Sequence, residues 1–109
     1  MNLQELSQAM HEFVQTKGWY APNSPRPQTL RNLSASLSIE AAEILEHFQW
    51  DENDYDKKAL AGELADIALY LLQLARVSEI DLEEAILAKL TENYGRQWNT
   101  PAGKERSNA

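Results

Sequence analysis

Apolar residues recur at helical spacing in four stretches of the chain. The first stretch predicts a helix from about Leu3 to Lys17, and Gly18 is placed to end it. Its apolar stripe consists of Leu3, Leu6, Met10, Phe13 and Val14. Residues 21–27 follow, rich in Pro, Asn and Ser, and they predict a loop of the kind that often covers a binding site.

Two further helices are predicted in the middle of the chain. Thr29 is placed to cap the second, whose apolar stripe contains Leu33, Leu37, Ala41, Ile44, Leu45 and Phe48. A polar connection follows, in which Asp54 is expected to cap the third helix. From Leu60 to Leu74 the third helix is apolar on nearly every side, so we expect it to be central or shared with another subunit.

The last helix is predicted to open at Asp81, which together with Glu84 resembles a capping box, and to stop at Gly95. We expect its buried stripe to be Leu82, Ile86 and Leu90. Residues 99–109 are polar and predict a flexible tail after a single domain of residues 1–98. The prediction is therefore an all-α bundle of four to five helices.

The polar positions of the second and third predicted helices include two pairs of acids. Glu40 and Glu43 lie three residues apart, and so do Glu63 and Asp66. This spacing brings both carboxylates of a pair to one side of a helix, about 60° apart around the axis. Two facing pairs form the all-oxygen pocket that hard divalent cations such as Mg²⁺ prefer. Because acids in so apolar a helix are costly to desolvate unpaired, we favour metal binding over an ordinary charged flank.

Composition narrows the classes of function. The chain has 109 residues, no cysteine and a formal net charge of -7. It cannot form disulfides or a cysteine-ligated zinc site, and its acidity argues against binding a nucleic-acid polymer. It shows no leader and no membrane-spanning apolar stretch, so we expect a cytoplasmic protein without a membrane partner. Its small size favours association into an oligomer.

Several other side chains do not indicate a site by themselves. His11 lies just off the first stripe and is typical of a partly buried or surface histidine. Lys89, Asn93 and Arg96 repeat at helical spacing and are typical of a solvated basic edge.

A family resemblance joins these features. The motifs that carry it are Glu40-Ala41-Ala42-Glu43, Phe48-Gln49-Trp50, Glu63-Leu64-Ala65-Asp66 and Tyr70. They resemble the metal-binding signature of the MazG-like nucleotide pyrophosphohydrolases, especially the dCTP pyrophosphatase branch. The resemblance implies an all-helical fold, homodimers or tetramers built from dimers, and hydrolysis of nucleoside triphosphates to monophosphate and pyrophosphate. It implies Mg²⁺ as cofactor, with Mn²⁺ as the substitute, and a role in removing non-standard or surplus nucleotides.

Residue by residue, the resemblance gives each position a role. The metal-ligand positions match Glu40, Glu43, Glu63 and Asp66. The positions around the base and sugar match His11, Trp19, Trp50 and Tyr70. The polar positions near the phosphates match Lys89, Asn93 and Arg96, although Tyr94-Gly95 interrupts the usual basic run. Ile39 stands where the wider family often has a first acid, which leaves the number of metal ions open.

The expected chemistry is attack of an oriented water on the α-phosphorus. Lys89 and Arg96 would hold charge on the pyrophosphate side, and either Glu43 or Glu46 would act as general base. A base would stack on Trp19 or Trp50. The preferred base and sugar are not given by the sequence.

Three other functions fit parts of the pattern. A di-iron or di-manganese oxidase needs histidines three residues after a glutamate, whereas His47 follows Glu43 by four. A non-catalytic helical module would use the apolar third helix for dimerisation and leave the acids solvated. A phosphoribosyl-ATP pyrophosphatase would share the fold, but Trp19 and Trp50 argue against it.

Overall fold

Four helices make up residues 1–96, the part of the chain that this computed structural model describes. They are α1 (Leu3–Thr16), α2 (Leu30–Phe48), α3 (Lys57–Val77) and α4 (Leu82–Tyr94). These residues contain no strand, which confirms the all-α prediction. The predicted tail, residues 99–109, and the last two residues of the predicted domain lie outside the described residues. Within the described part, no helix is long and apolar enough to cross a membrane.

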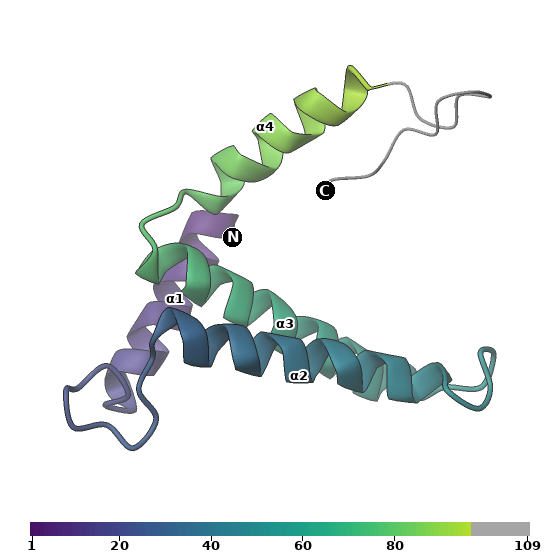
Figure 1. Cartoon of the computed structure of the whole chain (residues 1–109), viewed down its shortest axis with the longest axis horizontal. Coiled ribbons are helices and arrows are strands. Elements are labelled where there is room, and N and C mark those ends of the chain that lie inside the picture. Colours follow the sequence, from purple (N-terminus) through teal and green to yellow (C-terminus); the bar gives the residue numbers. More distant parts are fainter. Residues whose placement is uncertain (97–109) are drawn as a thin grey trace.

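The helices are arranged around α3. It runs antiparallel to α2 and packs against it, and α1 packs on α3 near its C-terminal end (Figure 1). The core joins Met10 and Val14 of α1 to Leu72 of α3. The prediction of a central third helix is therefore confirmed. In contrast, α4 leads away from the other three helices, and an open angle separates it from the α2–α3 pair (Figure 1).

The prediction that α4 buries an apolar stripe is wrong for Ile86 and Leu90 within one chain. Leu82 is half-buried against the core, but Ile86 is 45% exposed and Leu90 is 49% exposed. The reason is the direction of α4, which leaves the bundle after its first turn instead of packing along α3. Its apolar side chains therefore remain available to another surface.

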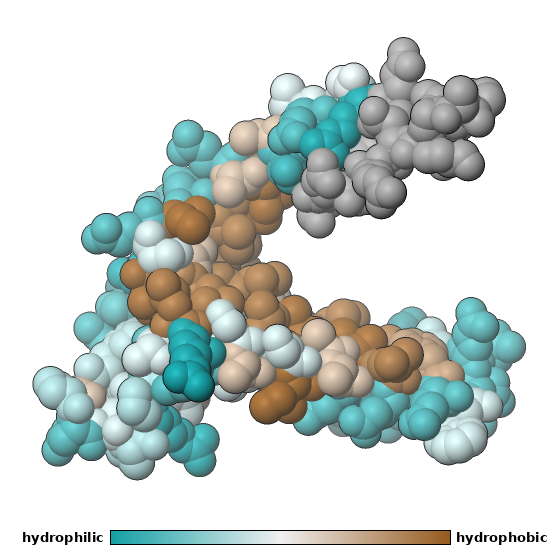
Figure 2. All heavy atoms as spheres, viewed as in Figure 1, coloured by the Kyte–Doolittle hydropathy of each residue, from teal (hydrophilic) through white to brown (hydrophobic). Residues whose placement is uncertain are grey.

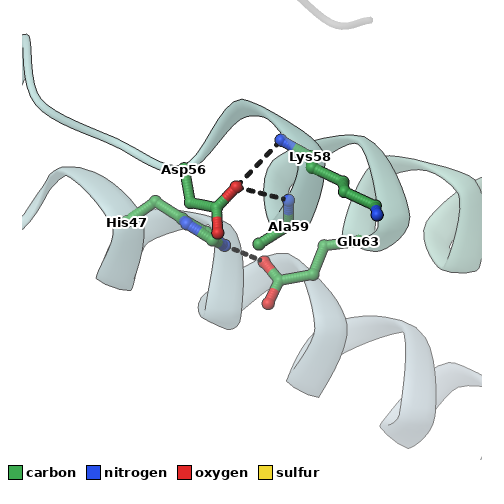
Figure 3. Close-up of polar contacts among 5 residues, drawn as sticks. All are labelled: His47, Asp56, Lys58, Ala59 and Glu63. Carbon is green, nitrogen blue, oxygen red and sulfur yellow. Dashed lines mark hydrogen bonds and ion pairs between the residues drawn. The ribbon is translucent and has the colours of Figure 1, made fainter.

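Local hydrogen bonds explain where the helices begin. Thr29 caps α2 as predicted, because its side-chain oxygen accepts from the Asn32 backbone N–H at 3.1 Å. The prediction of Asp54 as the cap of α3 is wrong. Asp56 directly precedes the helix, and its carboxylate accepts from the backbone N–H groups of Lys58 at 3.0 Å and Ala59 at 3.1 Å (Figure 3). Only Asp56 is adjacent to the unpaired N–H groups of the first turn.

The end of α1 fixes the start of the loop that follows. Gly18 has a φ of 73°, in the left-handed region that favours glycine. Its N–H donates to the Gln15 carbonyl at 2.9 Å, and the Trp19 N–H donates to the Val14 carbonyl at 3.3 Å. These two bonds form a Schellman motif, and its usual apolar contact is made by Trp19 packing against the core. The ring of Trp19 is thereby placed beside α1.

The end of α3 has the same geometry without a glycine. Glu79 has a φ of 60°, its N–H donates to the Arg76 carbonyl at 3.1 Å, and the Ile80 N–H donates to the Ala75 carbonyl at 2.7 Å. A side chain in this conformation costs roughly 1–2 kcal/mol. We therefore expect Glu79→Gly to raise the free energy of unfolding by about 0.5–1 kcal/mol, since greater freedom of the unfolded chain offsets part of the gain. Thermal unfolding measures this change.

Glu79→Ala is the matched control for this prediction. It removes the same charge but keeps the Cβ atom that makes the left-handed conformation unfavourable. An equal gain from Ala and Gly would mean that charge, and not backbone conformation, is responsible.

Candidate metal and nucleotide site

The packing of α2 on α3 brings the two predicted acid pairs together. Glu40 and Glu43 lie on α2, and Glu63 and Asp66 lie on α3. The carboxylates of Glu43, Asp66 and Glu63 all act electrostatically on Glu40. Glu40, Glu43 and Glu63 are half-buried, whereas Asp66 is exposed. The four acids therefore form one cluster, which we call the acid cluster, at the α2–α3 interface.

The acid cluster holds more negative charge than its surroundings stabilise. Burial raises the pKa of Glu40, and the charge of Glu43 and a carboxyl–carboxyl hydrogen bond with it raise the pKa further. Asp66 and Glu63 act in the same direction. Like charges held this close are unfavourable without a cation, so the donor set and its charge fit a hard divalent ion.

His47 joins the acid cluster from the last turn of α2. Its Nε2 lies 2.7 Å from Oε2 of Glu63, and both side chains are largely shielded from solvent, with 15% and 23% exposure (Figure 3). The contact links α2 to α3 directly and fixes the orientation of the Glu63 carboxylate. One feature of the sequence indicates that His47 belongs near the acids: it lies one turn after Glu43 on the same helix.

The carboxylates of the acid cluster do not converge on a single point. Among residues 1–96, no three side chains of histidine, aspartate or glutamate converge closely enough to hold a single ion as they stand. Binding a metal therefore requires rotation of side chains, with Glu63 starting from its contact with His47. Exposed Asp66 is the ligand with the most freedom to move.

A second group of predicted residues gathers where α1 meets the following loop. The His11 ring lies 5.2 Å from the ring of Tyr20, and the rings of Trp19 and Phe13 pack nearly perpendicular to each other with their centres 5.6 Å apart. Burial lowers the pKa of His11, and the charge of Arg76 lowers it further. The Nδ1 atom of His11 is buried without a hydrogen-bond partner. A neutral imidazole with an open ring nitrogen is suited to bind a polar group of a ligand.

The other predicted binding residues are not gathered in the same way. Trp50 follows α2 and is 89% exposed, and Tyr70 is half-buried on α3. Glu46 is exposed on α2 and does not act on Glu40. The structure thus brings together the four metal-ligand candidates, but leaves Trp50 in solvent within one chain.

The predicted phosphate-binding residues lie on α4, apart from the acid cluster. Lys89 contacts Glu92 at 3.4 Å, and Arg96 contacts the same carboxylate at 2.5 Å. Asn93 is half-buried on the same helix. Because α4 leads away from α2 and α3, these residues do not reach the acid cluster of their own chain (Figure 1).

A cavity of about 430 Å³ lies between α1, the end of α3 and the start of α4. Arg76 and Glu79 are among the residues that line it, but none of the four acids does. The cavity is thus distinct from the acid cluster, and we base the site on the carboxylates because their chemistry is specific.

Glu40→Gln tests the electrostatic description of the acid cluster. The pKa of Glu40 in the folded protein is raised above its ordinary value of 4.5, so the folded state favours the protonated carboxyl. The stability that protonated Glu40 contributes is fully present below the ordinary pKa and is lost as pH rises through the raised pKa. Gln imitates the protonated form at neutral pH. We expect the variant to unfold at a higher temperature than wild type without metal, and to lose stabilisation by Mg²⁺.

Glu46→Gln is the control for this measurement, because Glu46 lies on the same helix outside the set of charges that act on Glu40. A similar rise in unfolding temperature for both variants would contradict repulsion within the acid cluster.

Comparison with known proteins identifies the family of this chain. A family model described as the MazG-like family matches residues 35–109, which include both acid pairs. The chain belongs to the MazG-like family. Its members include nucleotide pyrophosphohydrolases, and the fold of this chain is the all-α fold of that family.

Individual proteins that are similar to this chain are named dCTP pyrophosphatase 1. The chain is 31% identical to dCTP pyrophosphatase 1 of Bos taurus over 103 residues, which is 86% of this chain and 58% of the relative. It is 30% identical to dCTP pyrophosphatase 1 of Homo sapiens, covering 98% of this chain and 64% of that protein. The chain thus spans less than two thirds of the length of these relatives.

A solved structure supports the fold. A pyrophosphatase from Archaeoglobus fulgidus matches with a TM-score of 0.66 and 32% sequence identity, over 86% of this chain and 93% of that one. The fold of the chain is thus shared with a protein of similar length.

Proposed function

We propose that this protein is a metal-dependent nucleoside triphosphate pyrophosphohydrolase, with deoxycytidine triphosphate as the leading substrate. The observation that carries the proposal is the acid cluster, in which burial and then carboxylates from two helices raise the pKa of Glu40 in a chain of the MazG-like family. Relatives named dCTP pyrophosphatase 1 support this choice of nucleotide. The role is removal of surplus or non-standard nucleotides.

The acid cluster supplies the ligands for the cofactor. Glu40, Glu43, Glu63 and Asp66 would hold Mg²⁺, or Mn²⁺ in its place, which neutralises phosphate charge and lowers the pKa of a bound water. Glu43 is favoured over Glu46 as general base because it lies within the acid cluster and Glu46 does not. His47 would support Glu63 as a metal ligand through the contact between their side chains.

The nucleotide base would lie near the end of α1. Trp19 and Tyr20 offer aromatic faces there, and His11 offers a buried ring nitrogen without a partner. Stacking accepts any base, so selectivity comes from polar atoms such as this nitrogen. Tyr70 of α3 and Trp50 complete the set of aromatic residues assigned to base and sugar.

The phosphate end of the site would be completed by a second subunit. Several large apolar side chains of α3 and α4 are exposed, and Figure 2 shows apolar surface along the inner side of the angle between α4 and the α2–α3 pair. These exposed residues are Leu64, Leu69, Leu71, Ile86, Leu87 and Leu90. A homodimer, or a tetramer built from dimers, would bury them and could bring Lys89, Asn93 and Arg96 of one chain to the acid cluster of another.

The test is pyrophosphate release from a panel of deoxy- and ribonucleoside triphosphates, with Mg²⁺ and with chelator. We expect release that depends on the metal, with dCTP among the best substrates. The ranking of the panel would identify the base and sugar. A folded protein that releases no pyrophosphate from any nucleotide would contradict the proposal and favour a non-catalytic helical module.

A further inference from the structure

Gln73 is a polar residue in the buried part of α3. It is 5% exposed and lies beside Leu72, which belongs to the core with Met10 and Val14. A buried amide without a partner is unfavourable by several kcal/mol in an apolar medium, so its hydrogen bonds define what it does. Those bonds lead away from the helix and toward the loop between α1 and α2.

A continuous series of contacts runs from Gln73 to Trp19. The Gln73 side-chain Nε2 donates a hydrogen bond to the side-chain oxygen of Gln28. The Nε2 atom of Gln28 donates in turn to the Arg26 carbonyl at 2.6 Å. The guanidinium of Arg26 lies over the ring of Trp19, 5.8 Å from the ring centre. One buried residue of α3 is thereby connected to an aromatic ring at the other end of the loop.

Besides this series of contacts, the loop is held to α2 at Pro27, whose carbonyl accepts from the Asn32 side-chain amide at 3.0 Å. Its backbone bonds are local, such as Ser24 N–H to the Ala21 carbonyl at 3.0 Å. Arg26 N–H donates to the Ser24 hydroxyl at 3.0 Å. The hydroxyl of Tyr20 also lies beside Gln73. Burial raises the pKa of Tyr20, and the neighbouring Gln73 side chain opposes this rise. Gln73 is thus attached to the loop by its hydrogen bond to Gln28, and the Tyr20 hydroxyl beside it is buried without a hydrogen-bond partner.

We propose that Gln73 is a positioning residue for nucleotide binding, which acts through Gln28 and Arg26 to hold Trp19 against the end of α1. This role rests on the proposed function, because it assigns Trp19 to the nucleotide base. The hydrogen bond of Gln73 goes to Gln28, and not to the acid cluster or to Trp19. Its substitution should therefore weaken binding of the base and leave the chemical step almost unchanged.

Gln73→Leu tests the proposal, because Leu fills a similar volume and removes both donor and acceptor. We expect faster hydrogen exchange at the amides of Ala21, Ser24 and Arg26, by about fivefold to tenfold for the loss of one buried bond. In steady-state hydrolysis of dCTP, we expect KM to rise by a similar factor while kcat stays within about twofold.

Two further variants make the test specific. Gln28→Glu can still accept from Gln73 but cannot donate to the Arg26 carbonyl, so it should raise KM although no buried residue has changed. Gln15→Leu makes the same chemical change on an exposed position of α1 and should alter neither exchange nor KM.

The outcomes separate this inference from the proposed function. Unchanged exchange in the loop of Gln73→Leu, or faster exchange with an unchanged KM, would overturn the role of Gln73 while wild-type turnover still supports the enzyme. Absence of turnover in wild type would reject the proposed function and with it the role of Gln73 in nucleotide binding. In that case the exchange data would still decide whether Gln73 holds the loop.

Discussion

Replacing Glu63 with Ala is expected to reduce pyrophosphate release by at least about a hundredfold, with the helical content of the protein unchanged. Glu63 is the carboxylate of α3 that also contacts His47 at 2.7 Å, so its loss removes both a proposed metal ligand and a link between α2 and α3. Changes in residues that only support a metal ligand typically cost 10–100-fold, and loss of a ligand itself should cost at least as much. Pyrophosphate release at saturating Mg²⁺, together with circular dichroism, measures both quantities.

Glu52→Ala is the matched control for this experiment. It also removes one acid, but from the exposed connection between α2 and α3, outside the charges that act on Glu40. Turnover of Glu63→Ala within about twofold of wild type, in a folded protein that hydrolyses nucleotides, would remove Glu63 from the proposed metal site.

Leu87→Glu is expected to convert the proposed homo-oligomer to monomers and to abolish the proposed turnover with it. Leu87 is 57% exposed on α4, next to Ile86 and Leu90 on the apolar side of that helix. Burying an unpaired charge in a subunit interface typically weakens binding by several kcal/mol, which is about a hundredfold or more in the dissociation constant. Sedimentation velocity over a range of protein concentrations measures the assembly, and pyrophosphate release at the same concentrations measures the activity.

Ala85→Glu provides the comparison. It adds the same charge to α4 on the side opposite Leu87 by helical geometry, at another exposed position. Monomeric wild-type protein at micromolar concentration, or full activity of a monomeric Leu87→Glu variant, would contradict a site shared between subunits.

The helices themselves were predictable because local chemistry determines them. The apolar period of Leu3 to Val14, the glycine at position 18 and the cap at Thr29 act over a few residues, and each has the predicted role in the structure. The choice between Asp54 and Asp56 as the cap of α3 could not be made reliably, because both precede the same helix and suit the same position.

The candidate site could be predicted only where it depends on spacing along one helix. The pairs Glu40–Glu43 and Glu63–Asp66 lie on single helices, so their common side follows from helical geometry. The contact of His47 with Glu63 and the bond of Gln73 with Gln28 join residues that are 16 and 45 positions apart. No local pattern contains such pairings, since they depend on how separate elements pack. The direction of α4 also depends on tertiary contacts, which explains why Ile86 and Leu90 are exposed.

The position of α4 has a consequence for how the protein responds to dilution. Helices of about 12–15 residues are only marginally stable in water on their own, and α4 has 13 residues with few contacts to the rest of its chain. In the proposed homo-oligomer, the folding of α4 should therefore be coupled to association, so that α4 unwinds as subunits separate. Since α4 carries Lys89, Asn93 and Arg96, a cell that lowers the amount of this protein would lose the proposed activity more steeply than in proportion to the number of chains.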